Sequence, residues 1–408
     1  MIAVDPARDV AVTGVGCVTA FGYGVEAFWD GLVNGSSAVV AADEDIGAGR
    51  RRYLRALAPP EASLTERARS SGLNARLRTT LMSLLSAREA WAMAELPAGT
   101  DPARIGVMMS RTHAQQAMIG RYKLTLWEKG PSAVSGLQFV ELIANSVLGR
   151  VALEFKARGP STLIFGGTAV GLAIEALRSE DVDAVLVGAF DEASDYLRYL
   201  CAESGVVAET ADARGGVGPY DRKRDGLVPG DGAAFVVLER PSFARARGKR
   251  PLAYLKGHGT VTDRVGVKTG VQRDADDLAE ALRRALDDAR VTSDAIAFQS
   301  GAGAGLHEFD ECELAAMDTV LNNRAQVFAT KGALGETWGA AGILGAIAAV
   351  LALERGVLPP TAGTHDVVAG YEARVVTGRA APHDGAAALA LNCDMLGQNQ
   401  ALVLAAAR

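Results

Sequence analysis

Strand-like and helix-like segments alternate along the whole chain, and this alternation most constrains the fold. Short runs of β-branched residues are followed by Ala- and Leu-rich stretches, and the pattern starts again after the polar, proline-bounded segment 240–251. Buried strands that alternate with helices are typical of parallel sheets covered by helices on both faces. We therefore expect an α/β fold with two halves of related topology, residues 1–250 and residues 251–408.

The expected elements follow from this pattern. In the first half we expect strands over 10–13, 105–109, 162–165, 184–189 and 233–238, and helices over 25–34, 76–95, 139–155 and 169–177. In the second half we expect strands over 252–256 and 295–299, helices over 274–289 and 311–321, and two final strands. The Gly after the first strand is expected to begin a turn.

The most apolar stretch, residues 339–353, is rich in Gly and Ala. A helix that spans a bilayer needs about 20 apolar residues, and this stretch is shorter. We therefore expect a tightly packed, buried helix and no membrane span. The N-terminal residues lack a basic region followed by an apolar segment, so we expect no secretory signal and a cytoplasmic protein.

Composition argues against several other classes of protein. The chain is 49% hydrophobic, which excludes intrinsic disorder, and its net charge of −6 argues against a nucleic-acid-binding protein. The four cysteines show no CxxC spacing. We therefore expect reduced thiols, with no disulfide framework and no metal site, at Cys17, Cys201, Cys312 and Cys393.

Four segments, read in order, carry a family pattern. They are VTGVG with the later FG and FW pairs (residues 12–29), GPSTLIFGGTAVG (159–171), PYDRKRDGLVPGDGAAFVVLE (219–239) and TKGALGETWGAAG (330–342). In these segments the chain resembles the β-ketoacyl synthase branch of the thiolase-like superfamily. The resemblance implies a thiolase-like fold, with two related halves in a layered α-β-α-β-α arrangement. The glycines of the last two segments are expected to permit close packing.

The resemblance also shows which catalytic positions have changed. Ketosynthases use a cysteine nucleophile and two histidines, which assist decarboxylation and stabilise the oxyanion. Aligned on the family motifs, the cysteine position holds Thr168 and the histidine positions hold Ala302 and Glu336. The family's acidic pair and lysine are retained as Asp310, Glu313 and Lys331. In the late GFGG gating loop only the last glycine remains, and Met395 replaces the phenylalanine.

We do not expect any histidine in the chain to replace the family's two catalytic histidines. The HGT at 258–260 looks like the family's histidine loop but follows the first strand of the second half, so we interpret it as a turn at the end of that strand. The other histidines, His113, His307, His365 and His383, do not cluster in the sequence.

A ketosynthase scaffold without its nucleophile and histidines resembles the chain-length factor, or ketosynthase β subunit, of type II polyketide synthases. This resemblance implies a heterodimer with an active ketosynthase, substrates carried on the phosphopantetheine of an acyl carrier protein, and no cofactor of its own. The chain would shape a tunnel that limits product length by bulk. We expect a helix at the interface over 112–122, with Gln116, Met118 and Phe139 at the tunnel. The basic run 50–52 is a candidate for contacting the carrier protein.

Three interpretations remain open at this stage. The first interpretation is the chain-length factor. The family's aromatic members usually carry glutamine at the cysteine position, so Thr168 favours a factor from a highly reducing system that makes polyenes. The second interpretation is an acyltransferase or decarboxylase that uses Thr168 with Glu336 as its base. If the two residues are not catalytic, their side chains would fill a closed, inactive site, for example by forming a hydrogen bond with each other. The third interpretation is a structural or acyl-binding protein without a ketosynthase partner.

Overall fold

The computed structural model describes residues 2–47, 49–73, 75, 77–113, 115–209, 218–264, 273–321 and 325–407. The strands of the first half are β1 (Val10–Thr19), β2 (Gly22–Tyr23), β3 (Val40–Asp45), β4 (Arg50–Arg55), β5 (Ile105–Arg111), β6 (Ser161–Phe165), β7 (Ala184–Asp191) and β8 (Gly232–Glu239). Those of the second half are β9 (Ala253–Thr262), β10 (Ile296–Gly301), β11 (Gln326–Ala329), β12 (Val357–Leu358), β13 (Ala381–Pro382), β14 (Ala387–Cys393) and β15 (Gln398–Ala406).

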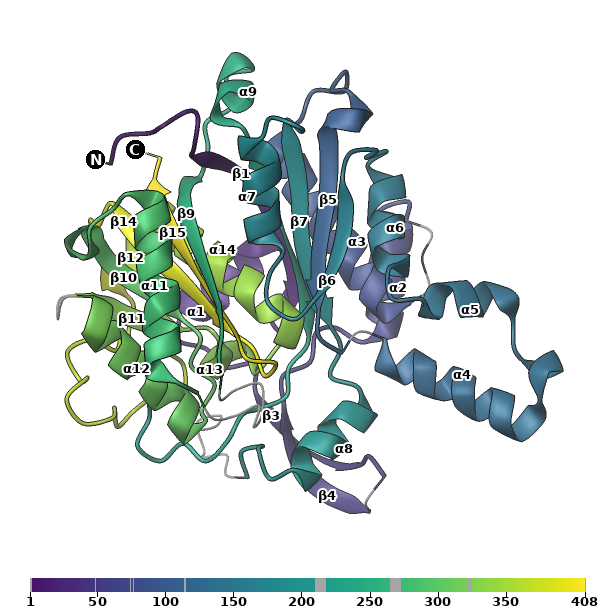
Figure 1. Ribbon diagram of the computed structural model, residues 1–408. Helices are drawn as coiled ribbons and strands as arrows, with labels where there is room; N and C mark the ends of the chain where they lie inside the picture. The colour runs from purple at the N-terminus through teal and green to yellow at the C-terminus, as the bar shows by residue number, and fades with distance from the viewer. Residues whose placement is uncertain are drawn as a thin grey trace.

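The two halves have the same strand topology. The main sheet has the order β11-β10-β14-β15-β9-β1-β8-β7-β5-β6. If the main strands are numbered from the first in each half, both halves have the order 3-2-4-5-1. The halves join where β1 pairs antiparallel with β9. Figure 1 shows them side by side around this junction.

The expectation of parallel sheets is wrong for the strands next to the junction. In each half three strands are parallel, but β8 and β15 run antiparallel to both of their neighbours. For β14 and β15 the reason is the short turn at 394–397, because a connection this tight can join only antiparallel strands. The sequence shows the strand runs but not how such connections orient them.

Helices form layers outside and between the two halves. In the first half they are α1 (Val25–Val33), α2 (Glu61–Ser70), α3 (Arg78–Ala94), α4 (Gln116–Lys129), α5 (Gly136–Leu142), α6 (Ser146–Glu154), α7 (Val170–Arg178), α8 (Asp195–Glu203) and α9 (Pro241–Ala246). The second half has α11 (Ala275–Ala289), α12 (His307–Val320), α13 (Lys331–Leu334) and α14 (Ala341–Arg355).

The layers match the expected α-β-α-β-α arrangement. Helix α3 packs on the outer face of the first half, and α11 on that of the second. Helices α7 and α14 lie between the halves, where α14 contacts β14 and β15 on one side and β8 on the other. Apolar clusters fill the space around the central helices and beneath each outer layer.

The buried helix expected over 339–353 is confirmed as α14. All of its residues from Ala341 to Leu353 are buried. Within the described residues, one continuous helix, Trp338–Arg355, is long and apolar enough to cross a membrane, and 89% of this stretch is buried inside the protein. The bent pair of α5 and α6 passes the same test when it is counted as one span.

Glycines in β1 have a different role from the expected turn. The strand continues through Gly14 and Gly16 to Thr19, beyond the end expected at residue 13. A Cβ atom at Gly14 would lie 2.0 Å from the carbonyl oxygen of Ala90, and one at Gly16 would lie 2.2 Å from that of Ser86. The glycines therefore allow the backbone of α3 to pack directly on the strand.

Two expected helices have different bounds. The helix expected over 139–155 is split into α5 and α6, whose axes differ by 92°. The chain turns between them, where the Ser146 hydroxyl donates to the Glu141 carbonyl over 2.9 Å. The helix expected from residue 76 begins at Arg78, and residue 76 itself lies outside the described residues.

A pair of helices projects from the body of the molecule. Helices α4 and α5 contact each other, and Figure 1 shows them extending away from the edge of the sheet formed by β6. No residue of α4 or α5 is buried. Large apolar side chains are exposed on these two helices and at the neighbouring edge, among them Leu124, Trp127, Leu137, Phe139, Leu153, Phe165 and Leu172.

Candidate functional site

The segments of the three replaced positions are each held by a charged side chain. Glu313 accepts the N–H of Ala302, Lys331 pairs with Glu336, and Asp394 accepts the N–H of Gly167, the residue before Thr168. Burial raises the pKa of the Cys393 thiol at the end of β14, and the charges of Arg273, Glu313, Lys331 and Asp394 all act on it. The charged groups that support the three positions therefore all act on one buried thiol.

Thr168 lies just before α7, where its backbone is already fully bonded. Its N–H donates to Oε1 of Gln400, and the Gln400 Nε2 donates back to the Thr168 carbonyl over 3.1 Å. The preceding N–H, that of Gly167, donates to Asp394 Oδ2 over 2.6 Å. Acyl transfer requires free backbone donors that point at the developing oxyanion. Here side chains of the same protein take the N–H groups of both Gly167 and Thr168.

Glu336 is held in a buried ion pair. Its Oε2 lies 2.6 Å from Lys331 Nζ, and both side chains are about 95% buried, at 5% and 6% relative exposure. Its Oε1 accepts the Trp338 N–H over 2.7 Å. The suggested bond between Thr168 and Glu336 is therefore wrong. Both Glu336 oxygens are taken by Lys331 and the Trp338 N–H, so the geometry gives Thr168 no activating partner in this residue.

Ala302 occupies a loop that keeps its supports. The Ala302 N–H donates to both carboxylate oxygens of Glu313 at 3.1 Å. Glu313 also accepts the Tyr220 hydroxyl over 2.8 Å and the Gln299 amide over 2.6 Å. The loop that positions a histidine in the family is thus kept in place, but its side chain at this point is a methyl group.

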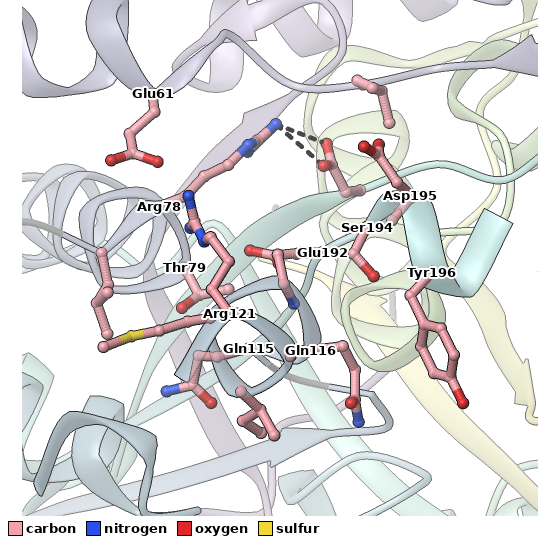
Figure 2. A pocket seen from close by; sticks show the side chains of 18 of the residues that line it. Glu61, Arg78, Thr79, Gln115, Gln116, Arg121, Glu192, Ser194, Asp195 and Tyr196 are labelled. Atoms are coloured by element: carbon pink, nitrogen blue, oxygen red, sulfur yellow. Dashed lines mark hydrogen bonds and ion pairs between the residues drawn. The ribbon is translucent and has the colours of Figure 1, made fainter. Parts of the chain in front are cut away.

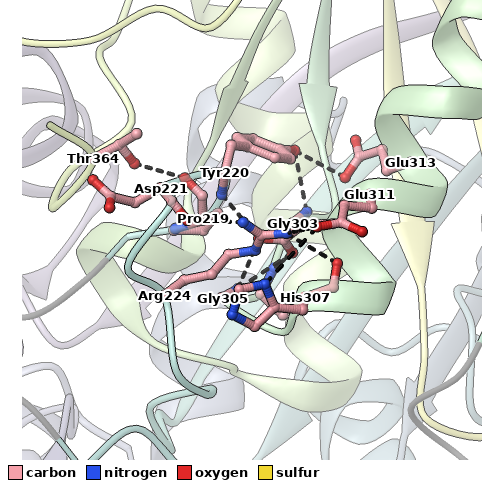
Figure 3. A network of polar contacts seen from close by, with 12 residues as sticks. Pro219, Tyr220, Asp221, Arg224, Gly303, Gly305, His307, Glu311, Glu313 and Thr364 are labelled. Carbon is pink, nitrogen blue, oxygen red and sulfur yellow. Dashed lines mark hydrogen bonds and ion pairs between the residues drawn. The ribbon is translucent and has the colours of Figure 1, made fainter. Parts of the chain in front are cut away.

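Asp310 also supports the loop that carries Ala302. Its carboxylate accepts the N–H groups of Ala304 over 2.7 Å and Tyr220 over 2.9 Å, and the Arg224 guanidinium lies 3.3 Å away. Figure 3 shows Arg224 and Tyr220 converging on this loop from the segment 219–224. Both Asp310 and Arg224 are almost fully buried. The retained acidic pair is therefore structural here.

Met395 lies in the turn between β14 and β15. Asp394 organises this turn, because its Oδ1 accepts the N–H groups of Leu396 and Gln398 at 2.9 Å. Met395 packs against an apolar cluster that includes Trp338 and Cys201. The side chain at the family's gating position thus lies beside the loop of Glu336.

The glycines of the last two motifs permit close packing, as expected. A Cβ at Gly342 would lie 2.4 Å from Thr168 Cγ2, and one at Gly230 would lie 2.2 Å from the Leu334 carbonyl oxygen. The start of α14 therefore packs directly on Thr168. A bulky residue at Gly342 has no room.

The three proposed tunnel residues do not lie together. Gln116 and Met118 line a pocket of about 680 Å³ beside the N-terminus of α4 (Figure 2). Phe139 lies on α5, is 54% exposed, and packs against Tyr122 with ring centroids 6.3 Å apart. The expected helix over 112–122 begins only at Gln116, so His113 precedes it.

One other expectation from the sequence needs correction. His258 lies within β9, so the HGT segment is not a turn; its ring lies 3.4 Å from Glu175 and packs beside Gly171 of α7.

The basic run 50–52 begins β4, and each arginine lies opposite an acidic residue of β3 in the strand register. Arg51 pairs with Glu203 over 3.2 Å, and both of these side chains are about half exposed. Contact between this run and the carrier protein stays a prediction.

Sequence reasoning missed the residues that close the site. Gln400 and Asp394 belong to a hairpin far along the chain. Asp394 begins the gating-loop segment but was assigned no role, and Gln400 lies outside the family motifs. His113 was also assigned no role, yet its ring packs edge-on against Trp338 with centroids 4.8 Å apart. Burial lowers the pKa of His113, which favours a neutral ring.

Two buried carboxyl groups predict a pH-dependent stability. Burial raises the pKa of Glu192 and of Glu313 from 4.5 to about 7. Between pH 4.5 and about pH 7 the folded chain binds more protons than the unfolded chain. The free energy of unfolding therefore falls as the pH rises through this range. We expect urea unfolding to show a smaller loss of stability between pH 5 and pH 8 for Glu192→Gln than for the native chain. Equal losses in the two proteins would contradict this assignment.

Comparison with known proteins agrees with this architecture. The sequence profile "Beta-ketoacyl synthase, N-terminal domain" matches residues 7–244, and "Beta-ketoacyl synthase, C-terminal domain" matches residues 252–365. The chain belongs to the β-ketoacyl synthase family. Its fold is therefore the thiolase-like ketosynthase fold.

Relatives in this family include subunits of polyketide synthases. The tetracenomycin polyketide synthase ketoacyl synthase alpha subunit of Streptomyces glaucescens is 32% identical over 383 residues, which cover 87% of each chain. A solved structure described as the ishigamide ketosynthase/chain length factor is 27% identical, with a TM-score of 0.86 over 98% of this chain and 99% of that one. A type II ketosynthase solved with its acyl-carrier protein, AntDE:AntF, is 22% identical with a TM-score of 0.87 over 98% and 99% of the two chains, and shows the shared fold.

Proposed function

We propose that this chain is the non-catalytic, chain-length-determining subunit of a type II polyketide synthase. The observation that carries the proposal is the closed site: Gln400 takes the N–H of Thr168, while Lys331 neutralises Glu336. This ketosynthase scaffold thus has no nucleophile, no base and no free oxyanion donor at the three positions where the family performs its chemistry.

The proposed partner is an active ketosynthase subunit. Among the described residues β6 is the edge strand of the main sheet, and the neighbouring helices expose large apolar residues. Such a surface is typical of a large, permanent interface. A protomer that lacks catalytic groups gains nothing by pairing with itself, so we infer a heterodimer. The likeness to a ketosynthase/chain length factor supports this choice.

The substrates are inferred from the same comparison. We propose that the complex elongates chains carried on the phosphopantetheine of an acyl carrier protein, in the cytoplasm, with no cofactor bound to this chain. Thr168 in place of the aromatic systems' glutamine favours a highly reducing system that makes polyenes. Gln116, Met118 and Phe139 remain the proposed contacts with the tunnel.

The test is the native mass and activity of the chain alone and with a ketosynthase encoded beside its gene. We expect a one-to-one complex that elongates malonyl units only when both chains are present. A stable homodimer that elongates malonyl units by itself would contradict the proposal. A homodimer without activity, which forms no complex, would favour the structural or acyl-binding interpretation.

Restoring the nucleophile alone is not expected to restore chemistry. In Thr168→Cys the backbone donor would still be held by Gln400, and no histidine would be present as a base. The loss of one oxyanion donor costs about 10²–10³-fold in rate, and loss of the base costs about 10²–10⁴-fold. We therefore expect acylation of Thr168→Cys, followed by intact mass, to be at least about 10⁴-fold slower than that of the partner. A rate within tenfold of the partner's would show that the site is open.

A further inference from the structure

The pocket beside α4 has polar walls. Besides Gln116 and Met118, it is lined by Arg78 at the start of α3 and by Glu192 and Tyr196 from the segment after β7. Figure 2 shows these side chains around one space. Helix α4 contacts α8, and both expose apolar residues, including Leu124 and Leu200. The pocket therefore lies beside two helices whose exposed apolar residues the proposed partner would cover.

Glu192 is the ionisable member of a set of buried polar groups in this pocket that lack a full set of partners, together with the Thr79 hydroxyl and Gln115 Oε1. It is 8% exposed, and its Oε1 accepts the Ala117 N–H over 3.1 Å. Within the part of the chain that the structure describes, Oε2 makes no hydrogen bond or ion pair. Arg78 lies nearby but is committed elsewhere, at 3.0 Å from Asp231 and 2.9 Å from the Ala58 carbonyl.

An apolar chain end that filled this pocket would remove water from Glu192 without replacing its hydrogen bonds. The cost of leaving a buried polar group unsatisfied exceeds the gain from burying several methylene groups. A chain end that carries oxygen would avoid this cost, since a hydroxyl or carbonyl group can bond to the carboxyl.

We propose that Glu192 is a specificity-determining residue, which stops an apolar chain end at the mouth of the pocket by its need for water rather than by bulk. The proposal rests on the proposed function, because the acyl chain would reach the pocket along the interface with the ketosynthase partner. It assigns the length limit to polarity, whereas the sequence suggested bulky side chains.

The test uses the reconstituted complex and the length distribution of its products. We expect Glu192→Leu to raise the ratio of longer to native-length products by about tenfold. Glu192→Gln should keep the native length, because the amide still needs hydrogen-bond partners. A native distribution from Glu192→Leu, or equal lengthening by both variants, would overturn the proposal. If the native pair forms no complex and makes no product, the proposed function fails instead.

A second measurement needs no substitution that affects folding. Burial raises the pKa of Glu192 to about 7, and Arg78, Arg121 and Asp231 also act on it. Glu61, Lys123 and Asp195 line the same pocket. The neutral acid costs less to dehydrate than the carboxylate, so the native complex should make longer products at pH 6 than at pH 8. Glu192→Gln should show a smaller shift. Equal shifts in both complexes would overturn the proposal.

Discussion

Replacing Asp310 by alanine is expected to lower the free energy of unfolding by about 3–5 kcal/mol. The substitution leaves the buried Arg224 guanidinium without its buried carboxylate partner, since Glu311, 2.9 Å away, is 58% exposed. It also removes the acceptor of the Tyr220 and Ala304 N–H groups. Breaking one side of a buried ion pair has costs of this size, because the remaining charge stays buried. Urea unfolding, followed by circular dichroism at one pH, measures the change.

The matched control is Asp366→Ala, which removes a carboxylate from an exposed pair. Asp366 lies 3.4 Å from Arg222, and both side chains are about half exposed, at 56% and 49%. Exposed pairs contribute about 0–1 kcal/mol, so this variant should unfold close to the native chain. If Asp310→Ala were no less stable than the control, the network around the Ala302 loop would not have the structural role assigned here.

Replacing Phe165 by arginine is expected to prevent formation of the heterodimer. Phe165 ends the edge strand β6 and is 54% exposed. The Arg111 guanidinium lies over the Phe165 ring, 5.3 Å from the ring centroid. A second guanidinium at this position would be buried by the partner beside a like charge. We expect the affinity for the partner to fall by at least about 100-fold, the usual size of an effect at an interface hot spot.

Val40→Arg provides the control for this substitution. Val40 is similarly exposed, at 50%, but lies on the separate pair of strands β3 and β4. Native mass at micromolar concentration should show heterodimer for Val40→Arg and separate subunits for Phe165→Arg. If Phe165→Arg formed a heterodimer of native affinity, the prediction would be wrong and the interface would lie elsewhere.

Much of the fold could be predicted from local sequence patterns. The alternation of strands and helices indicated two related halves, and the small residues of α14 indicated its burial. The direction of β8 and β15 was not predictable in this way, because it depends on the connections between strands. The length of β1 was also missed, since Gly14 and Gly16 look like turn residues until the backbone of α3 is placed against them.

The site could be predicted in its positions but not in its contacts. Motif spacing located Thr168, Ala302 and Glu336, and it also located Lys331, which pairs with Glu336. The contact that closes the site at Thr168 follows from tertiary packing, since Gln400 and Thr168 are 232 residues apart in the chain. The polarity of the pocket at Glu192 likewise appears only when four helices, α2, α3, α4 and α8, are assembled with the segment after β7.

The central claim is that this chain shapes the reaction without forming a bond to the substrate. The most direct test is the intact mass of both subunits after the heterodimer has been incubated with an acyl-loaded carrier protein. We predict an acyl group on the ketosynthase partner and no added mass on this chain. An acyl group on this chain, mapped to Thr168, would contradict the account and identify it as an enzyme in its own right.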